Sequence, residues 1–243
     1  MRPNLNWRAI PLGLCVVLVC SLVQAVQQPT AEEVVAKLDE LKGTLAAEVT
    51  EAMKTNVYTA SYTTVWRNFE DDAQAALCAA LKKHIPGLTD SNLDTGHTGS
   101  EKNRLADLAI VCGNQTIDVS IKAARGTGNP ENDMGTFRDH PNRKKLFVAS
   151  FTVFGRYADS GSAIKVERVF FDRTYRFIGK TTLVEGGVKY SRKDGNMRQK
   201  PWSMFESGKA YWNSEEEFEA AVKRSAKFRA KALVSEYEEL LKD

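Results

Sequence analysis

Histidine and cysteine are scarce in this chain of 243 residues, which has three histidines and four cysteines. Neither the histidines nor Cys78 and Cys112 have the paired spacing of zinc ligands. We expect Cys78 and Cys112 to be buried free thiols, with a disulfide between them as the alternative if the protein is exported. The Gly-x-Ser-x-Gly and Gly-x-Gly-x-x-Gly patterns are also missing, and no Gly-Lys-Ser/Thr closes the glycine-containing loop at 125–141, so that loop is not a P-loop. The chain therefore has no motif for a zinc centre, a nucleophile elbow, a dinucleotide site or a P-loop.

A strong charge of either sign is also lacking, because the net charge is only +3, and there are no internal repeats or low-complexity tracts. The hydrophobic share of 42% and the charged share of 27% are ordinary for a globular protein. The charge is nevertheless uneven, since residues 101–203 hold 19 Lys and Arg against 11 Asp and Glu. A basic middle favours a polyanionic partner, and a lysine-rich solvated surface is the alternative.

The first 25 residues have the pattern of an export signal. Arg2 and Arg8 precede an apolar run from Ala9 to Leu22, and Ala25 is a small residue after which a signal peptidase could cleave. The run is short for a membrane span, which needs about 20 residues. We expect a signal peptide over residues 1–25 and an exported, periplasmic or extracellular protein. The alternatives are a retained membrane anchor, or a cytoplasmic protein whose start codon is assigned too early.

The rest of the chain alternates helical and extended patterns. A capping box at Thr30 opens a helix to about residue 55, whose apolar spacing suits packing on its own domain or a coiled-coil homodimer. A second helix spans about residues 63–84, and strands are expected over 146–154 and 164–177. A final helix is expected over about 214–241, and it would pack on the sheet through Phe218, Val222, Leu233, Tyr237 and Leu241. These patterns predict an N-terminal helix within 26–60 and, over 61–243, an α/β domain with a mixed central sheet flanked by helices.

The most informative stretch is 105–125, which predicts two strands joined by a turn at 113–115. Strand alternation puts Asp118, Ser120 and Lys122 on one face. A loop with an even number of residues would place Asp107 opposite Ser120 or Lys122, whereas an odd loop would place it opposite Ile121. The register of this hairpin therefore decides whether the polar side chains meet.

Carboxylates beside a lysine suit the hydrolysis of a phosphodiester. A hard divalent ion held by carboxylates lowers the pKa of water and neutralises charge that develops on the phosphate. A lysine such as Lys122 can orient the water or stabilise the transition state. The structural alternative is a buried Lys–Asp pair that binds no metal.

The pattern Asp107, Ser120, Lys122, preceded by a helix, resembles the PD-(D/E)xK superfamily, which includes most type II restriction endonucleases. Two positions depart from that family, since Ala106 replaces the proline and Ser120 replaces the second acid. A minority of restriction endonucleases also have Ser-x-Lys and take the missing carboxylate from elsewhere. The candidates for that carboxylate are, in order of preference, Asp118, then Glu131 or Asp133 in the next loop, and Glu70 on the preceding helix.

The family often has a glutamate at the position of Glu70 that touches the metal through water. The alternative for Glu70 is a favourable interaction with the helix dipole, because acids are common in the first turns of helices.

The resemblance implies a restriction-endonuclease-like fold and Mg²⁺- or Mn²⁺-dependent endonuclease cleavage of DNA, with no small-molecule cofactor. Asp107, Asp118 and Glu70 would hold the metal, Lys122 would position the water, and Ser120 would support the lysine. One alternative is a nuclease fold that binds nucleic acid without cutting it, and another is an exported protein whose basic surface meets an anionic envelope. The basic side chains expected to contact DNA phosphates are Arg125, Arg143, Lys144, Lys145, Arg192 and Lys193.

Overall fold

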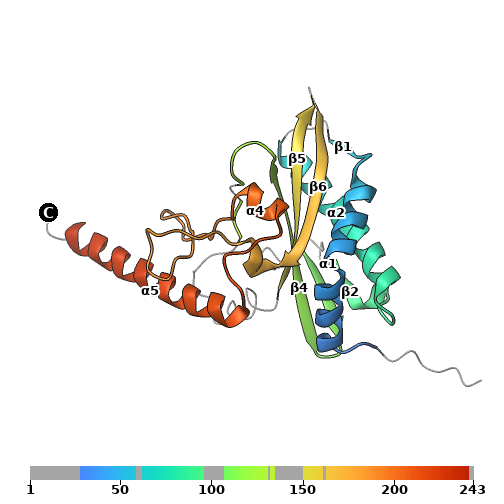
Figure 1. The fold of residues 1–243 in the computed structure, drawn as a ribbon, viewed down its shortest axis with the longest axis horizontal. Coiled ribbons are helices and arrows are strands. Elements are labelled where there is room, and N and C mark those ends of the chain that lie inside the picture. The colour runs from blue at the N-terminus through green and yellow to red at the C-terminus, as the bar shows by residue number, and fades with distance from the viewer. Residues whose placement is uncertain are drawn as a thin grey trace, which may run out of the picture.

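The computed structural model has three layers, with a β-sheet between two groups of helices (Figure 1). Helices α1 (Ala31–Met53) and α2 (Tyr62–His84) cover one face of the sheet. Helices α4 (Trp202–Glu206) and α5 (Glu215–Leu240) lie on the other side. The mixed α/β class predicted from the sequence is therefore confirmed. The structure describes residues 28–58, 62–95, 107–130, 132–134, 150–160 and 163–240.

The sheet has six strands in the order β1-β6-β5-β4-β3-β2. Strands β4 and β5 run parallel and the other neighbours run antiparallel, so the predicted mixed sheet is confirmed. The expected strand over 164–177 ends earlier, because residues 174–177 form a 3-10 turn. The strands are β1 (Val57–Tyr58), β2 (Leu93–Asp94), β3 (Leu108–Cys112), β4 (Gln115–Arg125), β5 (Phe151–Ser160) and β6 (Ala163–Arg173).

The main core lies between the sheet and helices α1 and α2. The capping box of α1 is formed as predicted, because Thr30 Oγ1 accepts from the amide of Glu33 and the Glu33 carboxylate accepts from the amide of Thr30. The apolar stripe of α1 is buried in the same cluster as alternate residues of β4, including Val119 and Ile121. This stripe therefore packs on its own domain, which was one of the two predicted alternatives, the other being a coiled-coil homodimer.

The opposite face of the sheet has a second core, which is rich in aromatic side chains. Phe154 of β5 packs against Trp202 and Phe205 of α4, with ring centroids 5.7 and 5.0 Å apart. An irregular hairpin over residues 178–200 completes this layer through three isolated bridges. Gln199 is fully buried in it and exchanges hydrogen bonds with the backbone of Asn132, so this hairpin holds the loop after β4.

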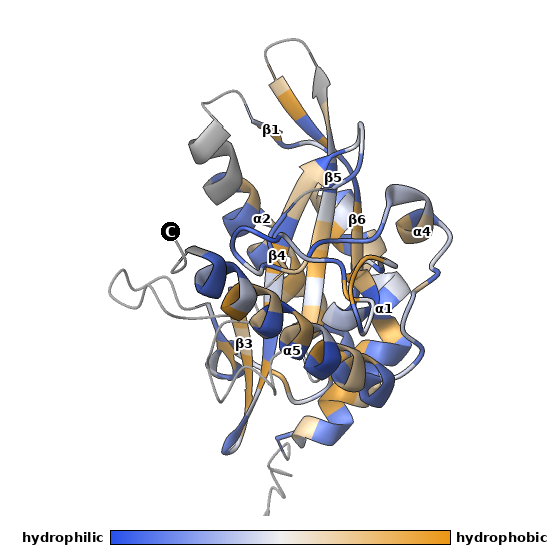
Figure 2. Cartoon of the chain, turned by 90° about the vertical axis from the view of Figure 1, so that its left-hand side faces the viewer, coloured by the Kyte–Doolittle hydropathy of each residue, from blue (hydrophilic) through white to orange (hydrophobic). Residues whose placement is uncertain are grey.

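Helix α5 packs on this second core only through its first half. Ser214 Oγ accepts from the amide of Glu217 at its start, and Phe218 is fully buried. The prediction that Tyr237 packs on the sheet is wrong, because this side chain is 66% exposed, and Leu233 is only half-buried. The physical reason is length, since the helix runs past the core that its first half covers (Figures 1 and 2). Leu241 lies outside the described residues.

Cys78 is half-buried and Cys112 is buried, and both are free thiols whose pKa is raised by burial. Free thiols were the first of the two alternatives, and the structure agrees with it. Within the described ranges, no helix has the length and apolarity that a membrane span requires. The expected signal peptide over 1–25 falls outside these ranges.

Candidate active site

The β3–β4 hairpin has the register that a shared site requires. Two residues join the strands, and the first of them, Gly113, has a φ of 61°, a left-handed conformation that glycine adopts without strain. The last pair of the ladder is Leu108 with Val119, and the amide of Asp107 still donates to the carbonyl of Val119 at 3.1 Å. Continuing this register by one residue places Asp107 opposite Ser120, which is the even-loop one of the two alternatives left open above, because Gln115 pairs with Cys112 and is not part of the turn.

The carboxylate of Asp107 is held at the end of this ladder. Its Oδ2 accepts the backbone amide of Ile121 at 2.5 Å and lies 3.8 Å from Nζ of Lys122. The Asp107 and Lys122 side chains are 23% and 32% exposed, so solvent and a ligand can reach both. The first two members of the predicted site therefore form a partly exposed ion pair.

Glu70 of α2 joins this pair from the helical layer. Partial burial, the negative charge of Asp107 and a hydrogen bond between their carboxyl groups raise the pKa of Glu70 to about 7, while Lys122 opposes the shift. Glu70 is the ninth residue of α2, not part of its first turn, so the helix-dipole explanation does not account for it. The described site thus brings two carboxylates and one lysine together.

Gln74 is the residue of this site that sequence reasoning missed. Its buried side chain amide donates to the carbonyls of Asp107 at 2.5 Å and Thr95 at 3.2 Å. The available signal was its spacing, since Gln74 follows Glu70 by four residues and therefore lies on the same helix face. Gln74 fixes the start of β3 to α2, and so fixes Asp107 relative to Glu70.

Asp118 lies apart from this group. It pairs with Ala109 in the ladder, and burial alone raises the pKa of its half-buried carboxyl. Ser120 is half-buried on the same strand face as Lys122. Over the described part of the chain, no three His, Cys, Asp or Glu side chains gather closely enough to hold a metal ion. The two carboxylates beside Lys122 are therefore those of Glu70 and Asp107.

The remaining predicted residues have varied positions. Arg125 is exposed at the end of β4, and its carbonyl accepts the indole N–H of Trp202. Arg192 and Lys193 are exposed on the irregular hairpin. Asp133 forms an ion pair with Arg198. The other candidates lie outside the described residues and comprise Glu131, Arg143, Lys144 and Lys145.

A small number of carboxylates is compatible with one hard cation. Mg²⁺ is commonly bound through one or two carboxylates and keeps several water ligands. The mutual repulsion of Glu70 and Asp107, which contributes to the raised pKa of Glu70, would be relieved by a cation held between them. The donor set therefore fits Mg²⁺ or Mn²⁺.

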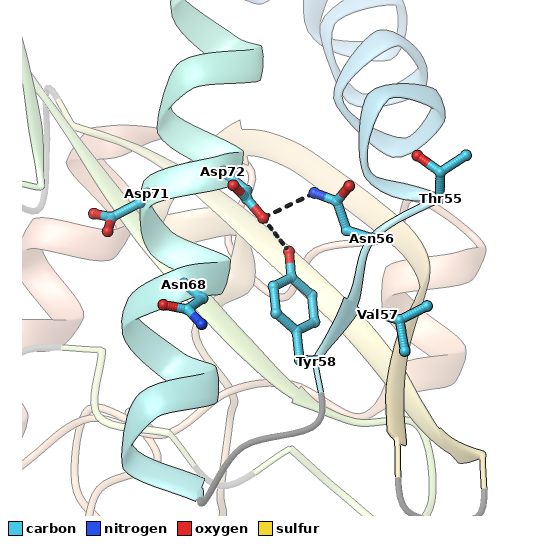
Figure 3. Close-up of a pocket in the computed structure, with 7 residues that line it drawn as sticks. All are labelled: Thr55, Asn56, Val57, Tyr58, Asn68, Asp71 and Asp72. Atoms are coloured by element: carbon cyan, nitrogen blue, oxygen red, sulfur yellow. Dashed lines mark hydrogen bonds between the residues drawn. The ribbon is translucent and has the colours of Figure 1, made fainter.

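A polar cleft of about 490 Å³ lies on another side of α2, between this helix and β1 (Figure 3). Asp72 accepts hydrogen bonds at 2.8 Å from Nδ2 of Asn56 and from the hydroxyl of Tyr58. Figure 3 shows Asp71 pointing away from these groups. The lining contains neither Glu70 nor Asp107, and its hydrogen bonds attach β1 to α2.

Comparison of the chain with protein-family models and with curated proteins finds no match. The functional argument therefore depends on the geometry and chemistry of the site.

Proposed function

We propose that this protein is a metal-dependent endonuclease that hydrolyses DNA phosphodiester bonds. The observation that carries the proposal is the meeting of Glu70, Asp107 and Lys122 at one partly exposed point. The resemblance of Asp107, Ser120 and Lys122 to the PD-(D/E)xK pattern supports the same chemistry and a restriction-endonuclease-like arrangement of the sheet.

Each side chain has a role in this proposal. Glu70 and Asp107 hold Mg²⁺ or Mn²⁺, with Glu70 preferred to Asp118 as the second acid because Glu70 contacts Asp107. When bound, the cation supplies positive charge to the phosphate and lowers the pKa of water. Lys122 orients the attacking water or stabilises charge on the phosphate, and Ser120, on the same strand face, supports the position of Lys122.

DNA suits the surroundings of the site better than a small substrate. The side chains of Asp107 and Lys122 are partly exposed, so a phosphodiester can approach them from solvent. Exposed Arg125, Arg192 and Lys193 can bind phosphates without reading bases. Export directed by residues 1–25 would let such an enzyme degrade foreign or environmental DNA, and the protein would then act outside the cytoplasm.

A second function has a specific observation in its favour. Among the described residues, two carboxyl groups lie near Lys122, and no third potential metal ligand joins them. Ser120 also occupies the position at which the family has an acidic residue. A nuclease fold that binds nucleic acid without cutting it would tolerate this deficit.

A cleavage assay separates the two functions. The purified full chain is incubated with supercoiled plasmid in Mg²⁺, Mn²⁺ or a chelator, and DNA binding is measured in parallel by fluorescence anisotropy. We expect metal-dependent nicking that falls by about a hundredfold or more in Asp107→Asn and Lys122→Met, because each change removes a group that stabilises developing charge. Asp118→Asn should retain activity, since Asp118 lies apart from the other three, and Asp90→Asn on the exposed 3-10 turn is the matched surface control.

Cleavage by Lys122→Met at the parent rate would refute the enzymatic assignment. DNA binding by the parent with no cleavage in either metal would instead support the inactive binding protein. Loss of binding with rising salt is expected in both cases.

A further inference from the structure

The C-terminal half of α5 extends away from the sheet. Figure 1 shows it running outward to the left, and in Figure 2, turned by 90°, the helix lies in front of the strands. Phe218, Ala221 and Ser225 are buried and attach the first half to the aromatic core. From Ala230 to Glu239 every residue except the half-buried Leu233 is exposed.

This outer half nevertheless has an apolar stripe. Ala226, Ala230, Leu233, Val234 and Tyr237 follow the spacing that puts side chains on one face of a helix. Val234 is 56% and Tyr237 is 66% exposed, and both are among the most exposed large apolar side chains of the described residues. A helical segment of this length measures about 20 Å and has no core of its own to cover.

Charged side chains follow one edge of this stripe in a definite order. Lys227 and Lys231 are one turn apart, and Glu238 lies two turns beyond Lys231 on the same edge. All three are exposed, and among the described residues no ion pair joins any of them to another side chain. The edge is therefore basic at its inner end and acidic at its outer end.

We propose that two copies of this chain associate through their α5 helices, packed antiparallel around a two-fold axis between Leu233 and Val234. In this register Ala230 faces the partner's Tyr237, so a small side chain lies opposite a large one. A two-fold contact of this kind is self-complementary, because each stripe covers the other. The proposal does not depend on the proposed nuclease function.

The charges favour the antiparallel direction. When two helices pack antiparallel, the same edge of each helix faces its equivalent, and the register above places Glu238 between the partner's Lys227 and Lys231. In a parallel pair this edge would instead face the opposite edge of the partner helix, so Glu238 would not meet the partner's Lys227 and Lys231. Opposite charges at the edge of an apolar seam select the direction and register of helix pairs.

The association should be weak. A seam of about three to four turns gives an interface in the small, transient class, for which we expect a Kd on the order of 10–100 µM. Measurements therefore need the full chain at concentrations up to about ten times that range.

Sedimentation equilibrium of the full chain tests the proposal. We expect a concentration-dependent dimer whose Kd rises by at least about tenfold in Val234→Asp, because each dimer then has two carboxylates in its apolar seam. Leu183→Asp is the matched control, since Leu183 is 73% exposed on the irregular hairpin and should leave the Kd unchanged. Far-ultraviolet circular dichroism of each variant checks that α5 remains helical.

A charge exchange tests the direction and register. Glu238→Lys should weaken the dimer, and the triple change Lys227→Glu, Lys231→Glu and Glu238→Lys should restore it, because every pair is then reversed. A parent that stays monomeric at the highest concentration overturns the proposal, as does a dimer that Val234→Asp leaves intact. A triple variant no tighter than Glu238→Lys overturns the register. Binding of a monomeric parent to anionic vesicles that Val234→Asp abolishes would overturn self-association in favour of a lipid surface.

Discussion

Replacing Gln74 by methionine should separate the contribution of one buried amide from that of the carboxylates near it. Gln74 is 5% exposed, and its amide group donates to the carbonyls of Asp107 and Thr95. Methionine has nearly the same length and volume but no hydrogen-bond donor. The change therefore removes both hydrogen bonds and leaves the packing of α2 on the sheet largely intact.

The expected cost follows from the two carbonyls. A buried polar group left without its partner costs about 1–3 kcal/mol, so two of them, partly reached by water after the change, should cost about 2–4 kcal/mol. This is a large share of the roughly 5–15 kcal/mol by which domains are typically stable. Because Gln74 no longer holds the backbone carbonyl of Asp107, the distance between the carboxyl groups of Asp107 and Glu70 should also become less defined, and plasmid cleavage should fall while the chain remains folded.

The free energy of unfolding is measured by urea denaturation of the parent, Gln74→Met and Gln115→Met. Gln115 is exposed at the start of β4, so the same chemical change there should stay within about 0.5 kcal/mol of the parent. Plasmid cleavage is followed as a function of Mg²⁺ concentration for each variant. If Gln74→Met unfolds and cleaves like Gln115→Met, Gln74 does not position Asp107 and the reasoning is wrong.

Two further changes test the packing and the electrostatics around the site. In Gly155→Ala the new Cβ would lie 2.3 Å from the ring of buried Phe69, and this overpacking should lower the free energy of unfolding by about 1–3 kcal/mol, as measured by thermal unfolding. The control is Gly43→Ala, which has nothing within 4 Å of the new Cβ and should be neutral or stabilising by up to about 1 kcal/mol. A neutral Gly155→Ala would contradict the packing of Phe69, the residue before Glu70, on β5. The pKa of Glu70 is about 7 in the folded chain, whereas its ordinary value is 4.5. Between these pH values the folded chain therefore holds a proton on Glu70 that the unfolded chain has lost. Without divalent ions, the free energy of unfolding should decline as the pH rises from 4.5 through 7. Glu70→Gln removes this contribution, and equal slopes in the parent and the variant would show that the shift is absent.

Prediction from sequence worked best where the determining contacts are local. Alternation along residues 115–125 places Asp118, Ser120 and Lys122 on one face because strand geometry has a period of two. The turn at Gly113 and Asn114 was also predicted, although its length, and with it the residue opposite Asp107, was left open until the structure showed Gln115 paired with Cys112. The strand face and the place of the turn depend on close neighbours in the chain, so the sequence alone contains them.

The partner of Asp107 could not be chosen in the same way. Asp118 is the first choice from the sequence because it shares a strand face with Ser120 and Lys122, yet Glu70 is the carboxyl group that contacts Asp107. Their contact depends on how α2 packs against the sheet, and Gln74, Phe69 and the absence of a side chain at Gly155 all take part in that packing. Such complementarity between distant segments leaves no periodic pattern to detect.

Helix α5 shows the same division. The sequence by itself determined that residues 215–240 form an amphipathic helix, because helical periodicity and the Ser214 cap are local properties. Only the tertiary structure decided which part of its apolar stripe is covered, since that depends on where the aromatic core ends relative to the helix. An apolar stripe has the same spacing whether its own domain, a second copy or solvent faces it, and so the environment of Tyr237 had to come from the folded chain.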